Sequence, residues 1–245
     1  MSGHSKWNNI KRKKEKTDAQ KAKIFTKIGR EMAVAVKEGG ADPSSNARLR
    51  DLVAKAKGMN VPNDNINRII KRAEGGEKDD YETIVYEGYG PSGVAIMVET
   101  LTDNRNRTAA NMRHYFDKYN GNMGQSGSVM FMFNQKGIIL LEQEQFDEDQ
   151  LMEDCFEAGA EDFDISEGMC EITADPAKVH EVSSALIKKG YAVVSAEAEY
   201  IPVTTVVLTG EENFKNMTLL LDKLDDDDDV QNIWHTLENE EALDR

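Results

Sequence analysis

Lys and Arg residues are concentrated in the N-terminal part of this 245-residue chain, where they could bind a polyanion. Residues 1–73 hold 18 Lys and Arg against 7 Asp and Glu, a net charge of +11. The other 172 residues hold 12 against 38, a net charge of −26. Lys and Arg neutralise phosphates, and an aromatic ring among them can stack on a base. We expect the nucleic-acid-binding residues to be Lys6, Trp7, Lys11, Arg12, Lys13, Lys14, Lys16, Lys23, Lys27 and Arg30.

A solvated surface face is the alternative interpretation of these cations. Residues 1–16 contain few apolar groups around which a surface helix could fold, which favours a basic binding arm instead.

A second possible contact lies at Arg105 and Arg107, within the sequence TDNRNRT. Two arginines beside a helix N-terminus can bind phosphate. Equally, a polar residue of this segment can cap the helix while the arginines form interdomain salt bridges. The residues alone leave both possibilities open.

The sequence contains no evident set of residues with the types and spacing of a catalytic site. We therefore predict no enzyme activity, no catalytic residues, no bound metal and no cofactor. The motif GYGPSG, residues 88–93, matches G-x-G-x-x-G, but it contains a proline and precedes a strand rather than a helix, so it predicts a tight turn. Histidines are scattered. The run Asp225–Asp229 lacks the glycine and interleaved carbonyls of a cation loop and is typical of a solvated loop.

The remaining composition favours a cytoplasmic protein with no membrane segment. Cys155 and Cys170 have no metal-ligand spacing and form no disulfide framework. The apolar runs are far shorter than the roughly 20 residues that span a bilayer, and the N-terminus lacks a signal-peptide core. No small-molecule substrate is evident.

Three short amphipathic helices are expected to position the basic residues. Apolar residues at three- and four-residue steps predict a helix over 17–38. Asp42-Pro43 predicts the start of a second helix, which Gly58-Met59-Asn60 ends. The third helix opens at Pro62 and ends at Gly75-Gly76, and the turn before it loosely resembles a helix-turn-helix.

The rest of the chain alternates strands and helices, so the predicted fold class is α+β: a helical N-terminal domain plus two ferredoxin-like α/β sandwich domains, the second inserted in the first. Residues 1–76 form the arm and three-helix domain. Residues 77–134 plus 203–245 form a discontinuous middle domain, with strands predicted over 94–100, 129–133, 204–208 and 230–236. Residues 135–202 form the inserted domain, which is acidic. Three consecutive small units are the competing arrangement and would leave more sheet edge exposed.

Five segments carry a resemblance that covers nearly the whole chain: SGHSKWNNIKRKK, KIFTKIGREM, VPNDNINRIIKRA, YEGYGPSGVAIMVETLTDNRNRT and MRHYFDKYNGNMGQSGSVMFMF. Together they resemble the YebC family of transcriptional regulators, to which the mitochondrial translational activator of cytochrome oxidase is similar. The resemblance implies a three-domain fold with a helical N-terminal domain. It also implies a DNA-binding role or a ribosome-associated role in translation.

Two functions therefore stay open, with a protein scaffold as a third that would leave the basic arm unexplained. The first is a DNA-binding transcriptional regulator. The second is a translation factor that binds ribosomal RNA, and the ribosome, through its N-terminal domain and assists elongation. The acidic body favours RNA, because a long duplex lying along it would be repelled. The resemblance favours DNA.

Overall fold

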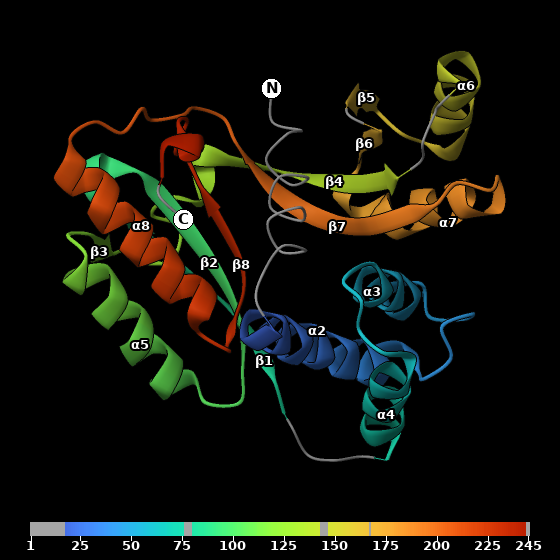
Figure 1. Ribbon diagram of the computed structural model, residues 1–245, viewed down its shortest axis with the longest axis horizontal. Helices are drawn as coiled ribbons and strands as arrows, with labels where there is room; N and C mark the ends of the chain where they lie inside the picture. The colour runs from blue at the N-terminus through green and yellow to red at the C-terminus, as the bar shows by residue number, and fades with distance from the viewer. Residues whose placement is uncertain (1–17, 76–79, 143–146, 167, 244–245) are drawn as a thin grey trace. The chain divides into compact units, whose positions relative to one another are not determined.

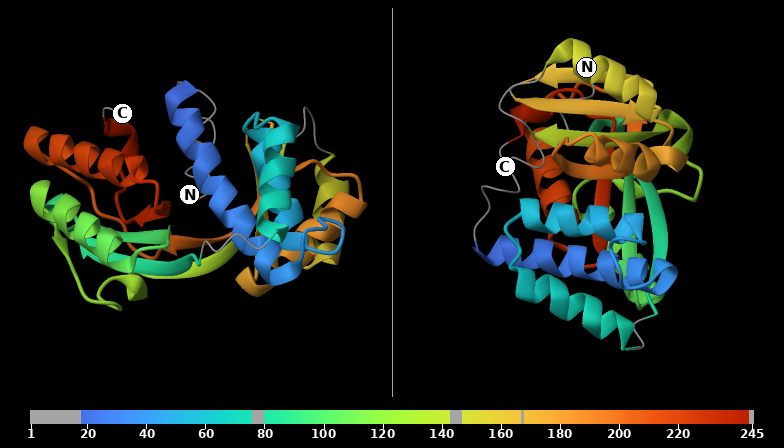
Figure 2. Two further views of the ribbon diagram at one scale, coloured as in Figure 1. Left: turned by 90° about the horizontal axis from the view of Figure 1, so that it is seen from below. Right: turned by 90° about the vertical axis from the view of Figure 1, so that its right-hand side faces the viewer.

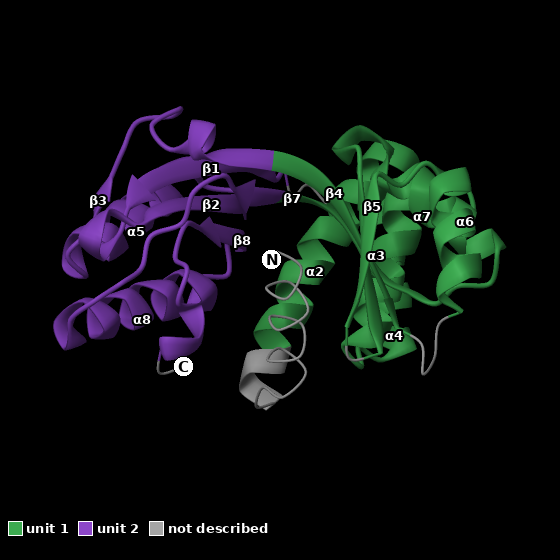
Figure 3. Cartoon of the chain, turned by 90° about the horizontal axis from the view of Figure 1, so that it is seen from above, with its two compact units in different colours: residues 1–77, 135–199 green, residues 78–134, 200–245 purple. Residues whose placement is uncertain are grey.

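The computed structural model describes residues 18–75, 80–142, 147–166 and 168–243. It divides into two compact units, coloured separately in Figure 3. Unit 1 comprises residues 1–77 and 135–199, and unit 2 comprises residues 78–134 and 200–245. Unit 1 contains the N-terminal helices and a four-stranded antiparallel sheet, and unit 2 contains a second such sheet. The mixed α and β composition predicted from the sequence is confirmed, while the three-domain division stays a prediction.

The N-terminal helices of unit 1 are α2 (Asp18–Gly39), α3 (Ala47–Gly58) and α4 (Asn63–Glu74). Their apolar faces share one core, which includes Ile28, Met32, Leu49, Leu52 and Ile66. The second helix begins later than predicted. The side chain of Asp42 accepts hydrogen bonds from the backbone and hydroxyl of Ser44, which holds a turn, and Asn46 is the N-cap instead.

The sheet of unit 1 has the strand order β5-β6-β4-β7. Along the chain, two helices separate its strands in the ferredoxin-like order. Leu151 and Cys155 of one helix, and Val182 and Leu186 of the other, pack on Ile139 and the sheet's other apolar residues. The elements are β4 (Phe133–Glu142), α6 (Glu148–Ala158), β5 (Asp162–Ser166), β6 (Met169–Ala174), α7 (Val179–Lys188) and β7 (Val193–Pro202).

The sheet of unit 2 has the order β3-β1-β2-β8, and α5 and α8 lie on the same side of it (Figures 1 and 2). The core between helices and sheet includes Ile96, Met112, Phe116, Leu220 and Leu224. The elements are β1 (Glu82–Tyr89), β2 (Ala95–Thr102), α5 (Arg105–Lys118), β3 (Asn122–Met123), α8 (Glu211–Asp226) and β8 (Val230–His235).

Two predicted strands of this sheet are wrong, and the sequence missed β1. Residues 130–132 form a 3-10 helix, and β4 begins only at Phe133. Within the predicted strand 204–208, Val206 makes one isolated bridge, to Leu237. Strand β1 instead occupies the position between β3 and β2.

The motif GYGPSG closes the hairpin between β1 and β2, as predicted for a tight turn. Gly90 donates its N–H to the carbonyl of Val94 at 2.8 Å. Ser92 and Gly93 both adopt positive φ, at 59° and 77°. Gly93 therefore serves the backbone geometry of this turn.

Candidate nucleic-acid interface

The predicted arm residues Lys6, Trp7, Lys11, Arg12, Lys13, Lys14 and Lys16 lie outside the described residues. Of the three predicted residues on α2, Lys23 and Arg30 are partly exposed, whereas Lys27 is only 8% exposed. Lys27 was expected to contact nucleic acid together with Lys23 and Arg30, but its side chain is buried.

At the second predicted contact, around Arg105 and Arg107, the structure confirms that a polar residue caps the helix. The side chain of Asn104 accepts a hydrogen bond from the backbone of Arg107 and caps α5. The Arg107 guanidinium contacts Asp103 at 2.9 Å and Asp229 at 2.9 Å. These two carboxylates raise the pKa of Arg107 through their hydrogen bonds. Arg105 is exposed at the start of the same helix.

Asp229 is a structural residue that the sequence did not reveal, and it corrects the prediction of a wholly solvated acidic run. Its side chain is buried and accepts hydrogen bonds from Thr102, Thr108 and Arg107. Asp227 accepts hydrogen bonds from Tyr115 at 3.0 Å and from Asn111 at 3.1 Å.

The pKa of Tyr115 is raised to about 12, first by burial and then by the charge of Asp227. The end of the acidic run, just before β8, is thus bound to α5 through the side chains of Asp227 and Asp229. Fixed donors replace solvent at these two carboxylates.

A polar interface that the sequence also missed joins α3 to the sheet part of unit 1. Asp51 is 3% exposed, and its carboxylate contacts Nδ1 of His180 on α7 at 2.6 Å. Lys55 contacts Glu197 on β7 at 2.5 Å and Glu31 on α2 at 3.8 Å. Burial opposes the Lys55 charge, but the carboxylates more than offset it and raise the pKa of Lys55.

The face of α3 that carries Asp51 and Lys55 is therefore covered by His180 and Glu197 of the same unit. Each of these two pairs joins residues more than 100 positions apart in the chain, so no local sequence pattern indicates it.

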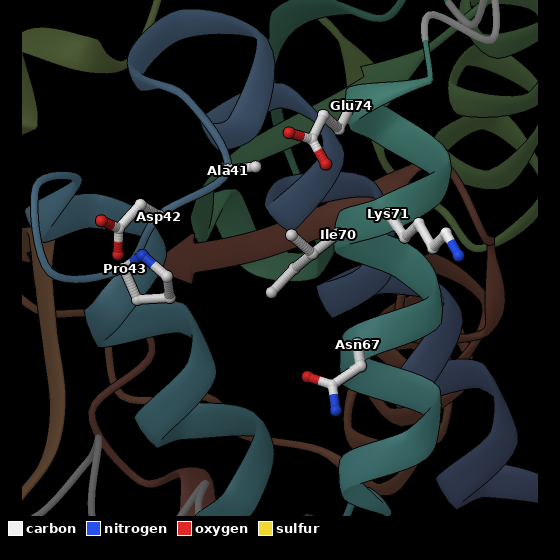
Figure 4. Close-up of a pocket in the computed structure, with 7 residues that line it drawn as sticks. All are labelled: Ala41, Asp42, Pro43, Asn67, Ile70, Lys71 and Glu74. Carbon is white, nitrogen blue, oxygen red and sulfur yellow. The ribbon is translucent and has the colours of Figure 1, made fainter.

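Helix α4 presents a different face, with a hollow of about 500 Å³ between it and the segment that joins α2 to α3 (Figure 4). Asn67, Ile70 and Glu74 point from α4 toward this hollow, and Lys71 points away from it. The opposite wall contains Ala41 and Pro43, and Asp42 lies beside them with its carboxylate turned to its own segment. Hydrogen bonds from Ser44, first from its backbone, lower the pKa of Asp42.

The described part of the chain shows neither a metal-binding cluster nor a reactive cysteine. No group of three or more His, Cys, Asp or Glu residues there is placed to hold a metal ion. Cys155 and Cys170 are buried and free, and burial raises their pKa values to about 11 and about 12, respectively. Both are therefore thiols at neutral pH rather than nucleophilic thiolates. Among the described helices, none combines the length and apolar character needed to cross a membrane.

The fold and these contacts define a class of protein with a helical N-terminal part and two antiparallel sheets. Residues 5–76 match the family model described as TACO1/YebC protein N-terminal domain, and residues 81–237 match that described as TACO1/YebC second and third domain. The chain belongs to the TACO1/YebC family.

Named relatives are similar over almost their whole length. A probable transcriptional regulatory protein of Acetivibrio thermocellus is 53% identical over 96% of this chain and 98% of its own. One of the same description from Ruminiclostridium cellulolyticum is 54% identical over 98% of both chains. The crystal structure of a conserved hypothetical protein from Aquifex aeolicus has a TM-score of 0.80 and 40% identity, covering 94% of this chain and 96% of that one.

Proposed function

We propose that this chain is a non-enzymatic, nucleic-acid-binding regulator of gene expression, and specifically a DNA-binding transcriptional regulator of the cytoplasm. The observation that carries the proposal is the charge division, with +11 on residues 1–73 and −26 on the rest. A basic part on an acidic body concentrates attraction for a polyanion at one end of the chain. The names of the relatives support transcription as the process.

A ribosome-associated factor that binds ribosomal RNA and assists elongation is the second candidate. The acidity of the inserted region favours it: residues 134–205 hold 17 Asp and Glu against 4 Lys and Arg. Long duplex DNA would be repelled by this region, whereas a folded RNA can meet the basic part alone. In this reading the ribosome is the partner and no small-molecule substrate is needed.

The test replaces Lys11, Arg12, Lys13 and Lys14 by Ala in the full-length protein. If all four contact phosphate, the slope of log affinity against log salt becomes shallower by about three units for either nucleic acid. A matched control replaces four exposed lysines of the body (Lys118, Lys178, Lys188 and Lys215) and leaves the slope unchanged. Unchanged affinity and slope in the arm variant would refute nucleic-acid binding by the arm.

The same preparation separates the two candidates. A transcriptional regulator binds a specific duplex more tightly than a random one at physiological salt. A translation factor shows no such preference and instead sediments with ribosomes in a salt-dependent manner.

A further inference from the structure

In the helical part of unit 1, helix α3 is covered by other residues of the unit, whereas helix α4 has an exposed face. On α3, Asp51 and Lys55 are bound by His180 and Glu197 of the sheet part. On α4, Asn67, Arg68, Lys71 and Arg72 are exposed. A nucleic acid that approaches this part of the chain therefore meets α4 rather than the bound face of α3.

The hollow beside α4 is an open depression of about 500 Å³ on the surface, large enough for one flat ring. Its lining is mixed, and Asp42, Asn67, Lys71 and Glu74 are exposed. Ile70 and Pro43 supply apolar surface on opposite walls, and Asn67 and Glu74 supply polar groups directed into it (Figure 4). A flat ring with a polar edge fits such a lining, because its faces need apolar contact and its edge needs hydrogen bonds.

Charge divides this site into an interior and a rim. The Glu74 carboxylate points inward, so a phosphate inside the hollow would be repelled. Lys71 points outward and can hold a phosphate at the rim. This arrangement places a base inside and its backbone outside.

We propose that the hollow between α4 and residues 41–43 binds one unpaired nucleobase that carries an exocyclic amine. The proposal rests on the nucleic-acid binding proposed above and names the ligand's chemistry. Glu74 accepts a hydrogen bond from the amine, as carboxylates do from cytosine N4. Thymine offers a carbonyl oxygen at the same position, which the carboxylate repels. Asn67 has both donors and an acceptor and can serve either base.

The test measures binding of the full-length protein to fluorescent single strands of twelve dC or twelve dT at fixed salt. We expect the dC strand to bind at least about five-fold more tightly, since one good pairing discriminates by roughly that factor or more. Glu74→Gln supplies a donor that thymine can accept, so it should abolish or reverse the preference. Asn67→Ala should weaken both strands.

The matched control is Glu153→Gln on α6, which removes an equally exposed carboxylate outside the hollow. It should leave the ratio of the two affinities unchanged. Equal affinities in the unsubstituted protein, or a preference that survives Glu74→Gln, would overturn the base site while leaving the proposed function standing. Absence of binding to either single strand at low salt would overturn the base site, while the proposed function is decided separately by the duplex and ribosome measurements above.

Discussion

Glu87 shows how one buried carboxylate can determine the path of a whole segment. Its side chain on β1 is 2% exposed. It accepts backbone N–H groups from Gly127 at 2.6 Å, Val129 at 2.7 Å and Met130 at 2.8 Å. Three charge-assisted hydrogen bonds offset the cost of burying the charge. These bonds also occupy the backbone N–H groups of Val129 and Met130, which a strand over residues 129–133 would have needed for pairing.

Glu87→Gln is expected to lower the free energy of unfolding by roughly 2–3 kcal/mol, because an amide nitrogen replaces one acceptor and faces a backbone donor. Urea titration followed by circular dichroism measures the change. Glu153→Gln, an exposed carboxylate with the same chemical change, is the control and should shift stability by less than about 0.5 kcal/mol. Equal effects of the two substitutions would contradict this role for Glu87.

Asn46 connects two helices at the element scale. Its side-chain oxygen accepts from the backbone of Leu49 at 3.0 Å and so caps α3. Its side-chain nitrogen donates to the carbonyls of Ala35 at 2.7 Å and Gly40 at 2.9 Å, at the end of α2. One buried amide therefore satisfies the end of one helix and the beginning of the next.

Asn46→Ala should reduce the free energy of unfolding by about 2–3 kcal/mol, since it removes a cap and leaves buried carbonyls without a donor. Asn46→Asp keeps the capping oxygen and, when protonated at low pH, has one O–H donor in place of the two N–H donors, so it should fall between Ala and the native protein there. Thermal or urea unfolding gives both values. If Asp is no better than Ala when protonated, the capping bond contributes little.

Sequence patterns predicted elements whose partners are local and failed where partners are distant. Helices α2 and α4 and the strands of the inserted sheet were predicted because apolar spacing and Gly or Pro breaks mark them. Strand β1 was missed because Glu87 occupies a buried position, which interrupts the apolar pattern. Residues 129–133 were assigned to a strand on composition, but their backbone donors bind Glu87.

For the candidate site, too, the sequence predicted the features that depend on local composition and missed those that depend on distant partners. Charge along the chain predicted a basic N-terminal part, since charge can be counted. The burial of Lys27 and the pairing of Lys55 with Glu197 depend on the folded arrangement, and neither residue's neighbours in the sequence indicate it. The hollow beside α4 also requires two segments that the loop after α2 brings together.

On the scale of the whole molecule, two ion pairs of α3 differ in exposure. Lys55 pairs with Glu197 of the acidic insertion, whereas Arg48 pairs with Glu38 of the neighbouring helix α2. The Lys55 and Glu197 side chains are 13% and 21% exposed, whereas Arg48 and Glu38 are 45% and 61% exposed. Losing a partly buried pair costs more than losing an exposed pair, because water compensates the remaining charge less well.

A double-mutant cycle with Lys55→Met and Glu197→Gln should give a coupling energy of about 1–3 kcal/mol. The exposed pair, with Arg48→Met and Glu38→Gln, is the matched control and should give less than about 1 kcal/mol. Denaturant unfolding of the four proteins in each cycle supplies both numbers. Similar coupling in the two cycles would mean that the α3 contact adds no more than a surface pair.

The insertion within unit 2 has a consequence for the order in which the molecule can be made. Strand β2 pairs with β1, which precedes it directly, but its other neighbour is β8. As a nascent chain lengthens, the β1–β2 hairpin emerges early and must wait for everything from Asp103 to Asp229 before β8 arrives. During that interval one side of β2 has unpaired backbone groups, the state in which strands associate wrongly. Unit 1 can finish folding first, because its last strand, β7, ends at Pro202 and β8 begins only at Val230. The last strand then completes a sheet whose first strands were synthesised long before.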